Sequence, residues 1–311
     1  MRRRYLCGAL VAVLATAAAL SAATGRAATH SSTQLAKPSV MRVFKGGSKP
    51  ARPRRTNNLA YRGGVGGIGV ETAPKVYLVL WGSQWNGNDP SGESSLLQSF
   101  FTAVGGSNWV HSVTQYCQGV ASGTTTCPSG SAFAGGGVAF AGSQVWADSG
   151  SAAPAHPTQT QLANEAINAA NHFGNTTAGS NKTVQYVIAT SRGNSSSGFG
   201  TQYCAWHSST SSTAGNIAYT NLPYITDAGT SCGANFNNLG ANAGITIVEG
   251  HEMAETITDQ FPNGGWLDGS GEENGDKCAW SSATSKQPMG GNSFPVQPLW
   301  SNASSSCVLS Y

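Results

Sequence analysis

Residues 242–259 read NAGITIVEGHEMAETITD, and this stretch predicts the helix on which the fold and a candidate site both depend. Ile245 and Val248 recur at helical spacing and can face a core. Asn242 is a favoured residue type for a helix N-cap, and Pro262 lies just beyond the predicted end of the helix. We therefore expect a helix that packs one side into the protein interior.

Acidic side chains are concentrated in and after this helix. Residues 249–276 hold 8 of the 14 carboxylates of the whole chain and one of its six histidines. These carboxylates are Glu249, Glu252, Glu255, Asp259, Asp268, Glu272, Glu273 and Asp276. Like charges gathered in one place repel and raise one another's pKa unless a cation neutralises them. The stretch therefore predicts a metal site.

The helix spaces three candidate ligands four residues apart. His251, Glu255 and Asp259 can lie along one stripe, because side chains at i and i+4 share a helix face. His251 and Glu255 can bind one cation as the two histidines of His-Glu-x-x-His do in zinc proteases. Glu252 then stands where that pattern has its general base. One imidazole with carboxylates suits zinc, and it makes manganese or calcium more competitive than usual.

A further ligand must come from outside the pair His251 and Glu255. In order of preference we expect Asp276, Glu273, Asp259 or His207. The glycine-rich run 271–276 can fold back over the helix, because Cys278 can tether it. His207 and Trp266 can in addition line a pocket.

Structural interpretations of the same residues stay open. His251 can simply hydrogen-bond Glu255 on an exposed helix face, since a single His-Glu-x-x-Glu also occurs by chance. The acids of 259–276 can form a structural calcium site. His207 follows Cys204 closely and can belong to the shoulder of a disulfide.

The N-terminal part of the chain differs in composition from the rest. Residues 1–28 have the basic start, short apolar run and small residues of a secretory signal peptide. Residues 1–62 hold 12 of the 17 basic residues and no acid, so 5 basic and 14 acidic residues remain after them. We expect 29–62 to be a flexible basic leader or pro-segment that can shield the acidic site until it is removed. The basic tract lacks the interleaved aromatic residues of nucleic-acid binders, and no second apolar run predicts a membrane anchor.

Six cysteines remain if Cys7 leaves with the predicted signal peptide. They are Cys117, Cys127, Cys204, Cys232, Cys278 and Cys307. An even number in an exported chain predicts three disulfides, although the sequence alone permits many pairings. Proximity favours Cys117–Cys127, and elimination leaves Cys204–Cys232 and Cys278–Cys307. We therefore expect a secreted, extracellular protein.

Hydrophobic patterning predicts one α+β domain over residues 63–311. The predicted core strands are 74–82 and 184–190, with a weaker strand at 217–222, and the other predicted helices are 94–104 and 158–173. We expect a central sheet, a zincin-like metal-site helix, and a loop-rich C-terminal part held by disulfides.

Several short motifs occur in the order found in a known family. They are Tyr61-Arg62-Gly63-Gly64, the strand 76–80 followed by Trp81-Gly82, Phe100 followed by Trp109 and Tyr116, the run 187–191, and Cys204-Ala205-Trp206-His207. Over about residues 58–280 the chain resembles the exordium-like (phosphate-induced) secreted proteins. The resemblance implies an extracellular or cell-wall setting and growth-related roles, without implying an enzyme. The segment 250–259 departs from the plant members toward a metalloprotease pattern, and it is similar to uncharacterised bacterial members.

These features together predict a secreted, zinc-dependent hydrolase of the peptidase class, acting on extracellular protein or peptide. The alternative is a non-enzymatic extracellular module that binds cell-wall polysaccharide, with acids holding calcium and tryptophans stacking on sugars. A third possibility is an inactive zincin-like scaffold in which the helix is only structural.

Overall fold

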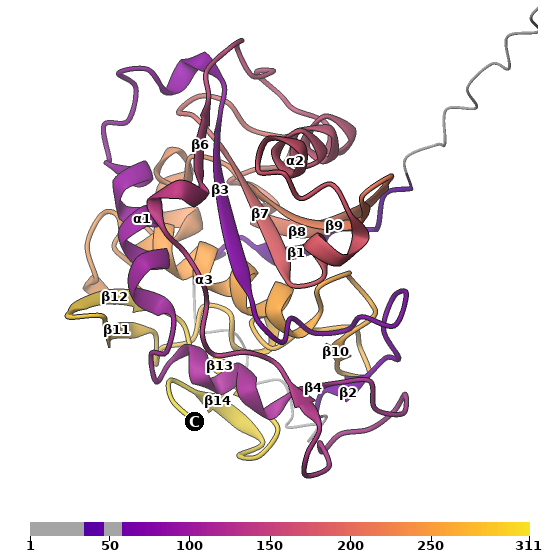
Figure 1. Cartoon of the computed structure of the whole chain (residues 1–311). Helices are drawn as coiled ribbons and strands as arrows, with labels where there is room; N and C mark the ends of the chain where they lie inside the picture. Colours follow the sequence, from indigo (N-terminus) through magenta and orange to yellow (C-terminus); the bar gives the residue numbers. More distant parts are fainter. Residues whose placement is uncertain (1–33, 47–57) are drawn as a thin grey trace, which may run out of the picture. The chain divides into compact units, whose positions relative to one another are not determined.

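A six-stranded mixed sheet organises the part of the chain that this computed structural model describes, residues 34–46 and 58–311 (Figure 1). Its strands lie in the order β1-β8-β9-β7-β3-β6. Strands β9, β7, β3 and β6 run parallel, whereas β8 is antiparallel to β9 and β1 is antiparallel to β8. In chain order these are β1 (Ser39–Arg42), β3 (Lys75–Trp81), β6 (Val145–Asp148), β7 (Val184–Thr190), β8 (Tyr203–Ser212) and β9 (Gly215–Leu222).

Helices cover both faces of this sheet. On one face, Leu162 and Ala166 of α2 (Gln159–His172) share a buried cluster with Tyr77 and Tyr186 of the sheet. On the other face, α1 (Glu93–Val104) and α3 (Ala243–Thr258) contribute to the larger core (Figure 1). Strand β7 is buried at every position because both of its faces are covered. The expected combination of helices with a central sheet is thus confirmed, and the sheet is mixed, with helices on both of its faces.

Short strands and 3-10 helices complete the described part. The strands are β2 (Ala60–Tyr61), β4 (Cys117–Gln118), β5 (Ala132–Phe133), β10 (Trp266–Leu267), β11 (Ser285–Met289), β12 (Asn292–Val296), β13 (Leu299–Ser301) and β14 (Ser306–Val308). The 3-10 helices are η1 (Ser83–Trp85), η2 (Val110–Gln115), η3 (Gly142–Gln144), η4 (Ala178–Asn181), η5 (Ile225–Cys232), η6 (Phe236–Asn238) and η7 (Asp276–Cys278). Within the described ranges, none of the helices has the length and apolar character needed to span a membrane.

The helices predicted from apolar spacing are confirmed. Thr158 caps α2, because its hydroxyl accepts from the Gln161 amide while the Gln161 side chain accepts from the Thr158 amide. Asn242 stands at the predicted N-cap of α3, but its side chain donates to the Ser91 carbonyl instead of capping the helix. Strand β8 was not predicted, because its second half is a run of serine and threonine with no alternation of apolar and polar residues.

The predicted flexible leader and the structure differ over residues 58–62, where Tyr61 of β2 is buried, and over residues 34–46. Here β1 lies along β8, and the Met41 side chain is fully buried in the core. The burial of Met41 and the pairing with the edge of β8 thus stabilise an ordered strand, although the composition of this segment is basic. Residues 29–33 and 47–57 of the predicted leader and the whole of the predicted signal peptide lie outside the described residues.

All three expected disulfides are present. They join Cys117 to Cys127, Cys204 to Cys232, and Cys278 to Cys307. Such bonds fit an oxidising compartment. The bond between Cys278 and Cys307 ties the end of η7 to β14 and so fixes the loop that precedes Cys278.

Removing Cys278–Cys307 should cost more stability than removing Cys117–Cys127, because it closes a longer loop: the sequence separations are 29 and 10. Chain entropy predicts losses of about 3.6 and about 2.7 kcal/mol for the two Cys→Ala double variants. Urea unfolding of the oxidised proteins measures both values. Equal losses, or the reverse order, would contradict this entropic account.

Candidate metal centre

Helix α3 is buried on all sides, including the face that carries its acids. His251, Glu252 and Glu255 each have a relative exposure of 0%. The sheet lies on one side of α3, β12 packs against it, and the loop that ends in η7 folds over its second half. An ordinary surface helix turns its charged side chains toward water. In α3 these side chains are buried, so something other than water has to offset the cost of burying them.

Six side chains from three parts of the chain meet there, and we call them the His/Glu cluster. They are His207 from β8, His251, Glu252 and Glu255 from α3, and Glu273 and Asp276 from the following loop and η7. The predicted fold-back of the 271–276 run over the helix is therefore present. Asp276 is the member that reaches solvent, with 21% of its side chain exposed.

His251 is held in one orientation by Gln297. The Gln297 amide nitrogen donates to the Gly275 carbonyl at 2.8 Å, which turns its oxygen toward His251 Nδ1 at 3.3 Å. With a proton assigned to Nδ1 by this network, Nε2 presents a lone pair whenever the imidazole is neutral. That Nε2 lies 3.1 Å from Glu255 Oε1 and 3.8 Å from Asp276 Oδ1, yet it makes no hydrogen bond. A lone pair facing carboxylate oxygens is repulsive unless a cation or a proton lies between them.

His207 links the other carboxylates of the cluster. Its Nδ1 lies 3.1 Å from Glu252 Oε2 and 3.7 Å from Glu255 Oε2, and its Nε2 lies 3.5 Å from Glu273 Oε1. The atoms His207 Nε2, Glu255 Oε2 and Glu273 Oε1 have no hydrogen-bond partner, although they are buried. Oxygen and nitrogen atoms that approach without hydrogen-bond geometry are placed as ligands of a shared ion would be.

The cluster contains two sets of three ligand atoms, and within each set the atoms lie within 4.8 Å of one another. One set comes from His251, Glu252 and Glu255, and the other from His207, Glu255 and Glu273. Glu255 belongs to both sets, which makes it the centre of the cluster. Asp276 belongs to neither set; it approaches His251 from the solvent side, and its backbone amide donates to Glu255 Oε1 at 2.8 Å.

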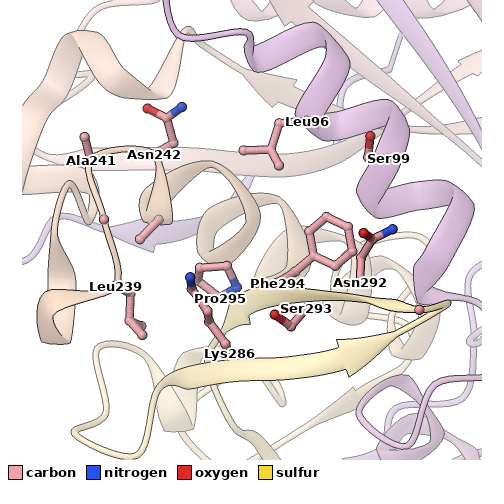
Figure 2. Close-up of a pocket in the computed structure, with 13 residues that line it drawn as sticks. Leu96, Ser99, Leu239, Ala241, Asn242, Lys286, Asn292, Ser293, Phe294 and Pro295 are labelled. Atoms are coloured by element: carbon pink, nitrogen blue, oxygen red, sulfur yellow. The ribbon is translucent and has the colours of Figure 1, made fainter.

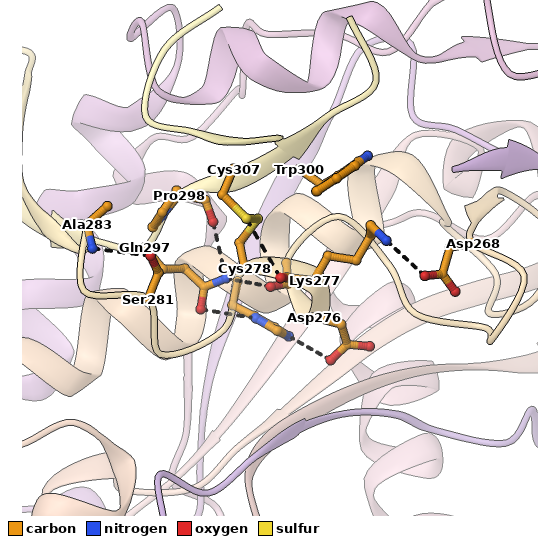
Figure 3. The surroundings of a disulfide bond; sticks show 12 residues. Asp268, Asp276, Lys277, Cys278, Ser281, Ala283, Gln297, Pro298, Trp300 and Cys307 are labelled. Atoms are coloured by element: carbon orange, nitrogen blue, oxygen red, sulfur yellow. Dashed lines mark hydrogen bonds and ion pairs between the residues drawn. A yellow bond between two sulfur atoms is a disulfide. The ribbon is translucent and has the colours of Figure 1, made fainter. Parts of the chain in front are cut away.

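Among the described residues, no lysine or arginine forms an ion pair with the cluster. Lys277 is the cation nearest in sequence, and Figure 3 shows its side chain directed to Asp268, at 2.9 Å. Four carboxylates and two imidazoles thus carry a net negative charge even when both imidazoles are protonated. Buried charge of one sign is costly, so the donor set fits a divalent cation.

The titration behaviour of the cluster reflects this excess of negative charge. Burial by itself lowers the pKa of His251, but Glu255 and the neighbouring carboxylates outweigh it and raise that pKa to about 10. Burial raises the pKa of Glu255, and the charge of Asp276 adds to this effect. Burial also raises the pKa of Asp276, to about 6. Without a cation, His251, Glu255 and Asp276 therefore hold their protons to higher pH than the free side chains do.

Gly275 allows the loop to lie directly on the cluster. A Cβ atom at this position would be 2.8 Å from His251 Nδ1 and 2.9 Å from Glu255 Oε1. Both distances are shorter than side-chain contacts allow. Any residue with a side chain would therefore collide with His251 and Glu255 at this position, and glycine avoids the collision. The sequence signal for this was the glycine-rich run beside the acids.

Several residues predicted for the site have other roles. Asp259 caps the turn after α3, since its carboxylate accepts from the amides of Asn263 at 2.7 Å and Gly264 at 2.9 Å and also from that of Gly265. Both of its oxygens are used, which corrects its expected role as a ligand. Trp266 is fully buried and donates to the Cys117 carbonyl at 2.9 Å, so it belongs to the core and not to the cluster.

Sequence reasoning missed Gln297 and Ser39. Gln297 orients His251 from a position 46 residues away, and no spacing rule predicts such a contact. Ser39 donates its hydroxyl to Glu273 from β1, a segment expected to be flexible. His207 is last in the predicted order of ligands, but β8 places it in one of the two sets of ligand atoms, with Glu255 and Glu273.

The cluster is separate from the surface pocket near the N-terminal end of α3. That pocket is lined by residues that include Leu96, Asn242, Phe294 and Pro295 (Figure 2). None of the six cluster residues lines it. An approach to the cluster has to use the side of Asp276 or the side covered by β1.

No family model, curated protein or solved structure matches this chain. The resemblance to exordium-like proteins therefore stays a prediction from its motifs, and the site has to be judged by its geometry.

Replacing Gln297 with methionine should weaken metal binding about 10- to 100-fold, because His251 loses the partner that fixes its tautomer and ring orientation. The matched control is Gln260→Met, since Gln260 is equally buried but donates to the carbonyls of Asn181 and Val184. Titration calorimetry with zinc on chelator-stripped protein measures both affinities. Equal losses in the two variants would mean that Gln297 acts on general stability alone.

Proposed function

We propose that this chain is a secreted, metal-dependent hydrolase, with zinc held by His251 and Glu255 and completed by Asp276, and with peptides as substrates. The observation that carries the proposal is the buried His251 Nε2, which faces the carboxylates of Glu255 and Asp276 at 3.1 and 3.8 Å, in a cluster that no lysine or arginine of the described residues pairs with. The three disulfides and the signal-like N-terminus support secretion.

Within this proposal the side chains of α3 divide the work. A zinc ion in such a donor set would polarise a carbonyl and acidify water. Glu252, whose carboxylate lies within 4.8 Å of ligand atoms of His251 and Glu255, is placed to accept a proton from the attacking water. His207 Nδ1, at 3.1 Å from Glu252 Oε2, holds that carboxylate in position. Asp276 marks the side open to solvent.

A purely structural ion, such as calcium, is the second candidate. Five of the six cluster residues are fully buried, and this burial favours an ion that holds α3 and the loop together. The polysaccharide-binding alternative has less support, because no tryptophan of the described residues is among the exposed large apolar side chains. Trp109 and Trp266, for example, are buried in the core.

Glu252→Gln and Glu255→Gln should fail in different ways. Glu255→Gln should weaken zinc binding, because a neutral amide is a poorer ligand than a carboxylate. Glu252→Gln should retain zinc and reduce peptide hydrolysis by about 10²–10⁴-fold, because an amide cannot accept the proton. Zinc titration and cleavage of a fluorogenic peptide library by the full chain give the two readouts.

Glu165→Gln is the control for both variants. Glu165 is a buried helical glutamate on α2, outside the cluster, so its loss should change neither readout. If Glu252→Gln hydrolyses peptide as fast as the parent, the general-base role has to be abandoned. If no form hydrolyses peptide but zinc or calcium raises the unfolding temperature, the structural ion is the better account.

A further inference from the structure

Strand β1 covers the His/Glu cluster from the edge of the sheet. It pairs antiparallel with β8, with Ser39 opposite His207 and Met41 opposite Ala205. The Ser39 hydroxyl donates to Glu273, and the Met41 amide donates to Glu252 Oε1 at 3.3 Å. Two of the cluster carboxylates are therefore contacted by this one short strand.

The contacts of the wider segment 34–46 run along the whole of β8. The Ala36 amide donates to the Ser209 carbonyl at 2.9 Å, and the Ser211 amide donates to the Gln34 carbonyl at 3.2 Å. These are main-chain hydrogen bonds, which any polypeptide can make. The segment lies at the end of the sheet order, so β8 would be the edge strand without it.

Side-chain contacts anchor this segment at a few points. Met41 is fully buried in the core. The Phe44 ring lies 5.1 Å from that of Phe236 and 5.8 Å from that of Trp280, measured between ring centroids. Main-chain pairing along an edge together with pockets for alternate side chains is the way proteins bind extended peptides.

We propose that the edge of β8 is a docking groove for an extended polypeptide and that β1 is its occupant within the chain. A second polypeptide that displaces β1 would run antiparallel to β8 and pass beside Glu252 and Glu273. If the proposed hydrolase function holds, on which this step rests, the substrate class is an extended, unfolded stretch of protein. The docked β1 then covers the side of the cluster that carries Glu252 and Glu273.

Loosening β1 should make the groove available to an added peptide. The probe is a fluorescent peptide with the sequence of residues 34–46, QLAKPSVMRVFKG, and a scrambled peptide of the same composition serves as its control. Binding to the full chain is followed by anisotropy with a chelator present, so neither metal nor hydrolysis enters the measurement. Phe44→Ala removes an anchor of β1 and should raise the apparent affinity about tenfold. The reason is that β1 is undocked in a larger fraction of molecules, which leaves the edge of β8 free to bind the peptide.

Phe140→Ala is the matched control, because Phe140 is also partly buried and packs on another ring, that of Phe101, away from β8. It should leave peptide binding at the level of the parent chain. Ser39→Ala, a smaller change that removes the hydroxyl bonded to Glu273, should raise the affinity in the same direction as Phe44→Ala. Binding unchanged by both β1 variants, or equal for the scrambled peptide, would overturn the groove and leave β1 as a permanent strand.

The possible results distinguish a failure of the docking-groove proposal from a failure of the hydrolase proposal. Peptide binding by the variants with no hydrolysis by any metal-loaded form would keep the groove and reject the hydrolase. Hydrolysis by the metal-loaded protein with no effect of Phe44→Ala on binding would keep the hydrolase and reject the groove.

Discussion

Helix α3 and the loop that follows it bury a group of carboxylates with which no lysine or arginine of the described residues forms an ion pair. Glu252, Glu255 and Glu273 are fully buried around two imidazoles, and Asp276 closes the group from the solvent side. Removing carboxylates from water costs several kcal/mol each unless an opposite charge compensates for it. No lysine or arginine of the described chain makes that pairing, so the arrangement requires protons or a cation.

Much of the fold can be understood as support for this group of side chains. Helix α3 supplies three of them at fixed spacing, β8 supplies His207, and the loop before η7 brings Glu273 and Asp276 over the helix. The Cys278–Cys307 bond and the glycine at 275 keep that loop close. Gln297 then fixes one nitrogen of His251 as a donor, which directs the other nitrogen at the carboxylates. Several buried atoms of the group lack a hydrogen-bond partner, and either protons on the two imidazoles or a bound ion would supply one.

The elements and residues that the sequence predicted are those governed by local spacing. The apolar repeat of α3 and the four-residue separation of His251 and Glu255 are properties of a helix, and both are present in the structure. The role of Asp259 could not be predicted in this way, because it depends on a turn that follows the helix. His207 was difficult to rank because the serine-rich half of β8 conceals the strand, and the contacts of Gln297 and Ser39 join segments far apart in the chain. The docking of β1 was missed because its basic neighbours dominate the composition of the leader.

Anomalous diffraction from crystals of chelator-stripped protein re-equilibrated with zinc tests the central claim most directly. The account predicts one strong peak per chain at the zinc edge, about 2.1 Å from His251 Nε2 and in contact with the Glu255 carboxylate. Crystals with no peak among these side chains, and with the Glu255 carboxyl hydrogen-bonded to His251 or His207 instead, would contradict it. In that case protons alone would balance the buried charge, and α3 would be a structural helix.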